Sequence, residues 1–263
     1  MDATQQAFTN RDKHASRVAH SEEEIETRIN TEGHSTAGGK LKSIVYGGMD
    51  GIITTFAVVA AASGGDLDRD VVLIMGISNM FADALSMGLG DAISSKAENE
   101  MVLREREREA WEVENYLDGE KTEMIEIYTA RGLAREQAVK MVDAMSSNAD
   151  FFTDQMVSDE LGMTLPDDDD SPWIDGAVTS ASFIFFGIIP LTVYIALRST
   201  DVQEDTLFGV SCGVTSVTLF ILGVVKSQFT RQSWYKAGFE ILGVGSVAAA
   251  VSYGVGYGVA GIV

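Results

Sequence analysis

Residues 71–112 limit what this chain can fold into more than any other stretch. They begin as an apolar, membrane-type segment and continue, with no proline or turn signal between, into a segment rich in glutamate and arginine. As one helix this stretch would be about 60 Å long, which is roughly twice the hydrocarbon thickness of a bilayer. The sequence therefore predicts a rod that crosses a membrane and continues into water.

Apolar segments long enough to span a bilayer recur along the chain. We expect five spans, at residues 43–62, about 71–93, 173–197, 207–225 and 237–261, because long apolar runs with few charges are typical of transmembrane helices. Pro190 should kink the third span. Gly47, Gly48 and Gly51 would let another helix approach the first span closely. The predicted fold class is an all-α membrane protein with five transmembrane helices.

A hydrophilic, helical stretch separates the second span from the third. Gly119 and Gly132 are the expected breaks, which gives three helices near 94–117, 120–131 and 134–162. The predicted organisation is a polar, flexible tail (1–39), the first two spans (40–93), a three-helix insert (94–170) and the last three spans (171–263).

Basic residues are distributed unevenly around the spans. Lys40 and Lys42 precede the first span, Lys96 follows the second, and the loop between the fourth and fifth is basic, whereas the opposite side has only Arg69 and Arg198. The positive-inside rule then places the N-terminus and the insert in the cytoplasm and the C-terminus outside. The polar tail lacks the pattern of a cleaved signal peptide.

The net charge of −20 argues against nucleic acid or an anionic surface as partner. Residues 98–170 hold 21 of the 39 acidic residues but only 7 of the 19 basic ones. Two explanations stay open: attraction of cations by the insert, and adaptation of the whole chain to high salt.

Histidine and cysteine, common ligands of transition metals, are scarce. Cys212 is the single cysteine, which excludes an internal disulfide and a thiolate cluster. His14, His20 and His34 all lie in the N-terminal tail, where scattered histidines are more often inert than metal-binding.

A polar stripe runs along the membrane half of the predicted rod. Asn79, Asp83 and Met87 recur every four residues on one helical face, and Asp50 lies inside the first span. A membrane carboxylate costs a few kcal/mol, so it normally faces an ion path or a partner. Thioether sulfur beside carboxylate suits a transition metal better than Mg²⁺ or Ca²⁺. A buried hydrogen bond between helices, with methionine as packing, is the alternative.

A second stripe, of glutamates, follows in the polar half. Glu105, Glu109 and Glu112 repel one another at this spacing, and a bound cation would remove the repulsion. Neighbouring arginines offer the compensating pairs Glu105–Arg108, Arg106–Glu109 and Arg108–Glu112, so a solvated charged helix fits equally well. Acids also begin the next helix, where the helix dipole favours them with or without a metal.

Three runs resemble the vacuolar iron transporter family, which includes the yeast vacuolar iron and manganese importer and the plant nodulin-21-like proteins. The family's opening is matched by HSTAGGKLKSIVYGGMDGIITTFAVVAA, its second-helix signature by ALSMGLGDAISSKAE, and its last two helices by ILGVVKSQFTRQSWYKAGFEILGVGSVAAAVSYGVG. The runs fall in order and at compatible spacing over about residues 34–260.

The resemblance implies a homodimer that exports Fe²⁺, and often Mn²⁺, from the cytoplasm in exchange for protons, with the ion path between the first two helices of each subunit. It implies no enzyme and no permanently bound cofactor, because the metal is the substrate. We expect the cell membrane of a prokaryote, either a halophile or not, and the vacuolar membrane if the source is eukaryotic.

The resemblance also assigns residues. The family's membrane aspartate and methionine correspond to Asp50 and Met87. Asn79 stands where members often carry an acid, and Asp83 could substitute for it; since asparagine does not titrate, this departure bears on proton coupling. The family's cytoplasmic metal ligands fall on Glu109, Glu112, Glu120, Glu123, Met156 and Glu160. Where some members have a second methionine, this chain has Val157.

Two other classes of function remain. A membrane-anchored metal sensor or ferritin-like store would bind metal without transport, although the insert lacks the histidine of a Glu-x-x-His pair. A purely structural membrane protein with halophilic acidity would bind none.

Overall fold

The computed structural model describes residues 10–12, 36–167, 171–200, 202–228, 230 and 232–262. Regular structure within these ranges is helical. Most of the predicted tail lies outside them, and so do His14, His20 and His34. Apart from residues 36–42, the helices considered below belong to a unit formed by residues 43–263.

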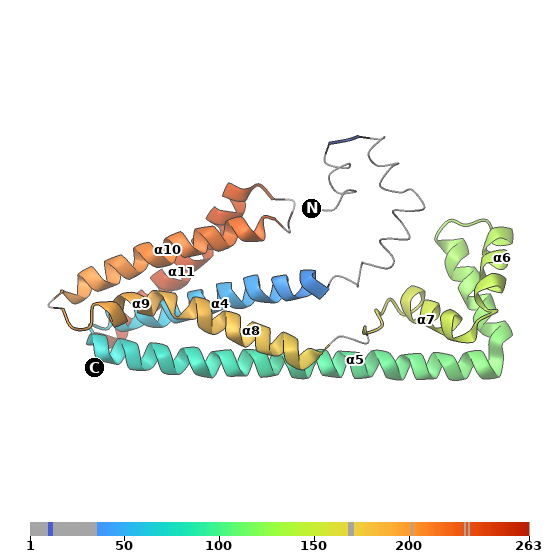
Figure 1. Ribbon diagram of the computed structural model, residues 1–263, viewed down its shortest axis with the longest axis horizontal. Coiled ribbons are helices and arrows are strands. Elements are labelled where there is room, and N and C mark those ends of the chain that lie inside the picture. The colour runs from blue at the N-terminus through green and yellow to red at the C-terminus, as the bar shows by residue number, and fades with distance from the viewer. Residues whose placement is uncertain are drawn as a thin grey trace. The chain divides into compact units, whose positions relative to one another are not determined.

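The predicted rod is present as helix α5, Arg69–Ala130, which runs for 62 residues (Figure 1). Its membrane half lies against α8, and its far half carries the other helices of the insert. The backbone leaves helical geometry inside α5 at Tyr116, with φ −148° and ψ 50°. The break predicted at Gly119 thus lies three residues earlier. Gly119 still contributes, because a Cβ there would clash with the ring of Tyr116.

Two short helices complete the insert: α6, Arg135–Met145, and α7, Ala149–Asp159. The break predicted at Gly132 is confirmed, with a positive φ of 107°. The prediction of a single helix over 134–162 is wrong, because the structure has two helices there. The helical stretch is interrupted at Asn148, whose side chain accepts a hydrogen bond of 3.1 Å from the amide of Phe151 and caps α7. Over the described residues 94–167 the insert therefore shows four helical segments, since the kink divides its part of α5 in two.

Four helices are long and apolar enough to cross a membrane in the described part of the chain: α4, α5, α10 and α11. Their bounds are Thr36–Gly64 for α4, Glu204–Lys226 for α10 and Trp234–Ala260 for α11. A fifth span results if α8 (Pro172–Gly187) and α9 (Ile189–Ala196) count as one helix bent by 43°. The predicted kink at Pro190 is confirmed. The hydroxyl of Ser211 donates a 2.8 Å hydrogen bond to the Pro190 carbonyl beside the bend.

Close helix contacts bring α4, α5 and α8 together in the membrane half. A Cβ on Gly51 would overlap the backbone carbonyl of Phe183, and one on Gly48 would overlap the ring of Phe186. The close approach predicted for these α4 glycines is therefore confirmed, with α8 as the neighbour. Gly88 of α5 meets Gly176 of α8 in the same way.

The insert has an apolar core of its own, which fixes the two sides of the kink against each other. Ion pairs of Arg106 with Asp150 and Asp154, the latter at 2.6 Å, tie α5 to α7. Arg131 pairs with Asp159 at the end of α7. The core consists of Val113, Met124, Tyr128, Ala138, Val142, Phe152 and Met156.

Candidate functional site

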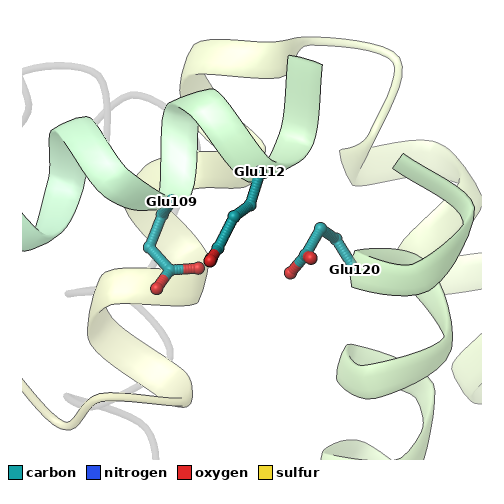
Figure 2. A group of neighbouring side chains, drawn as sticks. All are labelled: Glu109, Glu112 and Glu120. Carbon is teal, nitrogen blue, oxygen red and sulfur yellow. The ribbon is translucent and has the colours of Figure 1, made fainter. Parts of the chain in front are cut away.

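Glutamates from both sides of the kink in α5 face a common space. Glu109 and Glu112 lie in the last two turns of α5 before the kink at Tyr116, and Glu120 lies one turn after the kink. Figure 2 shows the three side chains converging. One carboxylate oxygen of each lies within 4.8 Å of the others. The kink therefore creates this group, because a straight helix would carry Glu120 away from Glu109 along its axis.

A second group of carboxylates shares a member with the first. Glu120, Glu123 and Glu160 also have oxygens within 4.8 Å of one another, and Glu160 comes from the C-terminal end of α7. Of the six residues that the resemblance assigned to the insert, five thus lie in one glutamate cluster. The sixth, Met156, lies one turn before Glu160, fully buried in the apolar core of the insert.

Two members of the glutamate cluster (Glu109, Glu112, Glu120, Glu123 and Glu160) are unusually buried for carboxylates. Glu109 is 1% exposed and Glu120 9% exposed, whereas acidic side chains are almost never fully buried unless they are paired. One oxygen each of Glu109 and Glu160, both Oε2, is buried and has no hydrogen-bond partner. Unsatisfied buried carboxylate oxygens are costly, so this arrangement calls for a cation.

The pKa values of two glutamates in the cluster, Glu160 and Glu120, are raised by burial and mutual repulsion. Burial raises the pKa of Glu160 to about 7, and repulsion from Glu109, Glu123 and Glu120 adds to the shift. Burial also raises the pKa of Glu120, again with help from the neighbouring glutamates. A divalent cation would remove both the repulsion and the unpaired oxygens. Glu120 belongs to both groups, so the cluster could hold two ions with Glu120 between them.

Arginines near the cluster pair differently from what the sequence suggested. Arg108 contacts Glu105 at 3.2 Å and Glu112 at 3.9 Å, as expected. It also binds Glu109 at 2.6 Å, while the predicted Arg106–Glu109 pair is replaced by the contacts of Arg106 with α7. Spacing on one helix could not reveal that second set of partners.

The membrane residues lie around a separate open pocket of about 320 Å³. Asp50 of α4 lines it together with Asp83 and Met87 of α5. Three further residues, Thr54, Ser86 and Phe183, complete the lining. Neither Thr54 nor Ser86 was predicted from the sequence, although Thr54 lies one turn after Asp50 and Ser86 directly precedes Met87. Phe183 comes from α8 and had no signal in the sequence.

Asn79 lies beside this membrane pocket and does not line it. Its Nδ2 donates a 2.6 Å hydrogen bond to Oδ2 of Asp83, one turn further along α5. Asn79 is therefore placed to orient Asp83. Asp50 is exposed on the surface of the single chain, although the surrounding helix is apolar.

Comparisons with known proteins identify the relatives of this chain. The model of the VIT family matches residues 41–257. A vacuolar iron transporter of Toxoplasma gondii is 40% identical over 257 residues, which cover 95% of this chain and 85% of that protein. One from Plasmodium falciparum is 38% identical, over 84% of this chain and 83% of that protein. Vacuolar iron transporter 1 of Arabidopsis thaliana is 32% identical, over 85% and 87%.

The match covers the membrane helices and the insert alike. It includes the membrane pocket and every member of the glutamate cluster, because all of these residues lie between positions 41 and 257. The chain is a membrane protein and belongs to the VIT family of vacuolar iron transporters.

Proposed function

We propose that this chain transports Fe²⁺, and also Mn²⁺, out of the cytoplasm. The observation that carries the proposal is that one continuous helix, α5, bears part of both candidate sites: Asp83 and Met87 in its membrane half, Glu109 and Glu112 in its polar half. The relatives named vacuolar iron transporter support iron as the substrate. Carboxylate oxygens together with a methionine thioether form a donor set suited to these ions.

The five-span topology is part of this proposal. Counting the bent pair α8–α9 as one span puts the insert between the second and third spans and the two termini on opposite sides. Together with the positive-inside rule, this favours a cytoplasmic insert. The glutamate cluster would then collect metal on the side from which it is exported. In a eukaryotic cell the membrane would be vacuolar, as the names of the relatives suggest.

A homodimer would complete the membrane pocket. Asp50 is exposed on an apolar helix of the single chain, and an isolated carboxylate in hydrocarbon is costly. A second copy packed over α4 and α5 would cover the open pocket and bring two sets of Asp50, Asp83 and Met87 together. The ion path would run between the first two helices of each subunit.

Transport would then proceed from one site to the other. The glutamate cluster binds the ion, the ion moves to Asp50 and Met87 in the membrane, and Asp83 assists from its position beside Asn79. Protonation of the pocket carboxylates from the far side would release the metal. Because Asn79 cannot titrate, Asp50 and Asp83 would carry the exchanged protons.

Uptake by proteoliposomes tests transport and proton coupling together. We expect Fe²⁺ to enter liposomes that contain the protein, and to enter faster when the interior is more acidic than the medium. Uptake indifferent to the pH gradient would exclude proton antiport. Metal binding without uptake beyond that of protein-free liposomes would instead favour a membrane-anchored sensor or store.

Metal binding by the insert should strengthen as the pH rises from about 5.5 to 7.5. Glu160, with a pKa of about 7, must lose its proton to coordinate a metal. Below pH 7 one bound proton should weaken binding by roughly tenfold per pH unit. Calorimetric titration with Mn²⁺ at several pH values measures this, and Glu160→Gln should flatten the dependence. Equal affinity at pH 5.5 and 7.5 would contradict it.

The stability of the metal-free protein should change in the opposite direction. The folded-state pKa of Glu160 lies above its ordinary value of 4.5. Its contribution to stability is therefore fully present below about pH 4.5 and is lost as the pH rises through about 7. Thermal unfolding without metal, compared between the wild type and Glu160→Gln, would show this as a difference that grows with pH.

A further inference from the structure

A positive side chain already occupies part of the glutamate cluster. The Nη2 of Arg108 lies 2.6 Å from Oε1 of Glu109 and 3.2 Å from Oε2 of Glu105, and its Nε lies 3.9 Å from Oε2 of Glu112. Glu109 is almost completely buried, whereas the side chain of Arg108 is 50% exposed. The carboxylate is therefore held in place, while the guanidinium can turn out into solvent.

Other cations of the insert pair away from the cluster. Arg106 binds the acids of α7, Lys121 pairs with Asp143, and Arg131 pairs with Asp159. Within the described part of the insert, Arg108 is the basic residue with ion pairs to the cluster. Among the described residues of the insert, it is the one that forms ion pairs with Glu109 and Glu112.

A metal ion and Arg108 compete for the same carboxylate groups, although Arg108 binds Oε1 of Glu109 and leaves its buried Oε2 without a partner. Glu109 and Glu112 both contact Arg108 and both belong to the group that faces Glu120. A divalent ion bound by this group would lie within a few ångströms of the guanidinium if Arg108 stayed in place. Like charges that close repel strongly in a partly buried site, so both cannot occupy it in full.

We propose that Arg108 is a tethered competitor for metal, which leaves Glu109 and Glu112 when a divalent ion binds and returns when the ion departs. This inference rests on the proposed metal-collecting role of the glutamate cluster. A collecting site must pass its ion on, and a built-in cation serves this by lowering the affinity. It also replaces the charge of the departing ion, so that the buried carboxylates are not left uncompensated.

Three variants of the full-length protein in detergent test the proposal. Arg108→Gln removes the competing charge and Arg108→Lys keeps it. Arg104→Gln makes the same change in net charge one turn earlier on α5, at an exposed arginine with no ion pair in the described structure. Mn²⁺ affinity by calorimetry should rise at least roughly tenfold in Arg108→Gln. It should stay within about threefold of the wild type in the other two variants.

Thermal unfolding gives a second readout. Without metal, Arg108→Gln should unfold at a lower temperature than the wild type, because Glu109 loses its partner. With saturating Mn²⁺ the difference should vanish or reverse, whereas an arginine with a purely structural role would leave a deficit in both conditions. The metal-induced rise in unfolding temperature should therefore be larger in Arg108→Gln than in the wild type.

The outcomes separate this inference from the function on which it rests. Wild-type protein that binds Mn²⁺, together with Arg108→Gln that binds it no more tightly, overturns the competitor role and leaves the collecting site standing. Wild-type protein that binds no Mn²⁺ overturns both. An equal gain in Arg104→Gln shows a general charge effect and also overturns the competitor role.

Discussion

Asp50→Asn should abolish Fe²⁺ transport and leave metal binding by the insert intact. Asparagine has nearly the same shape but lacks the charge, so the membrane pocket loses a carboxylate opposite Asp83 and Met87. Mutation of a residue that merely supports a metal ligand costs roughly 10–100-fold, so loss of the ligand itself should cost at least as much. Initial rates of uptake into proteoliposomes measure the first effect, and calorimetry with Mn²⁺ the second.

Asp66→Asn is a matched control for this experiment. Asp66 is exposed in the turn after α4, outside the membrane pocket, and its left-handed backbone conformation (φ 56°) is one that asparagine tolerates. It should transport at the wild-type rate. Near-normal transport by Asp50→Asn would place the ion path elsewhere in the bundle.

Glu120→Gln should have the largest effect on metal binding. Glu120 is the member shared by both groups of the glutamate cluster, so its loss disrupts each of them. We expect Mn²⁺ affinity to fall by about 100-fold or more, measured by calorimetry at pH 7.5. The metal-free protein should unfold at a higher temperature than the wild type. The neutral amide removes a buried charge whose raised pKa reflects burial and repulsion.

Glu114→Gln provides the comparison on the same helix. Glu114 is exposed and belongs to neither group, so its substitution should change both affinity and stability little. Glu120→Gln that bound Mn²⁺ as tightly as the wild type would exclude the cluster as the binding site. A fall in metal-free stability would contradict the electrostatic strain inferred from the burial of Glu120.

Much of the fold follows from local sequence. The rod was predictable because an apolar and a charged segment join without a helix breaker. The bend between α8 and α9 was predictable because Pro190 lacks an amide hydrogen. The kink at Tyr116 was not predictable, because tyrosine is compatible with a helix. The kink depends on the Tyr116 ring packing against Gly119, where a Cβ would clash with it. The division of the last insert helix at Asn148 was missed, although asparagine is a preferred N-cap.

The candidate sites were predictable only in part for the same reason. Spacing alone placed Glu109 and Glu112 on one face of α5. It could not bring in Glu120 or Glu160, because their approach depends on the kink and on the packing of α7. Family resemblance supplied these residues. Phe183 entered the membrane pocket through the contact of α8 with Gly51, which only tertiary packing determines.

One measurement tests most directly whether the two sites act in series. It is the initial rate of Fe²⁺ uptake into proteoliposomes as a function of Fe²⁺ concentration, compared among the wild type, Asp50→Asn and Glu120→Gln. Asp50→Asn should show no uptake above protein-free liposomes at any concentration. Glu120→Gln should need a higher Fe²⁺ concentration but approach the same maximal rate, because it weakens collection and not the path. Uptake by Asp50→Asn equal to that of the wild type would contradict transport through the membrane pocket.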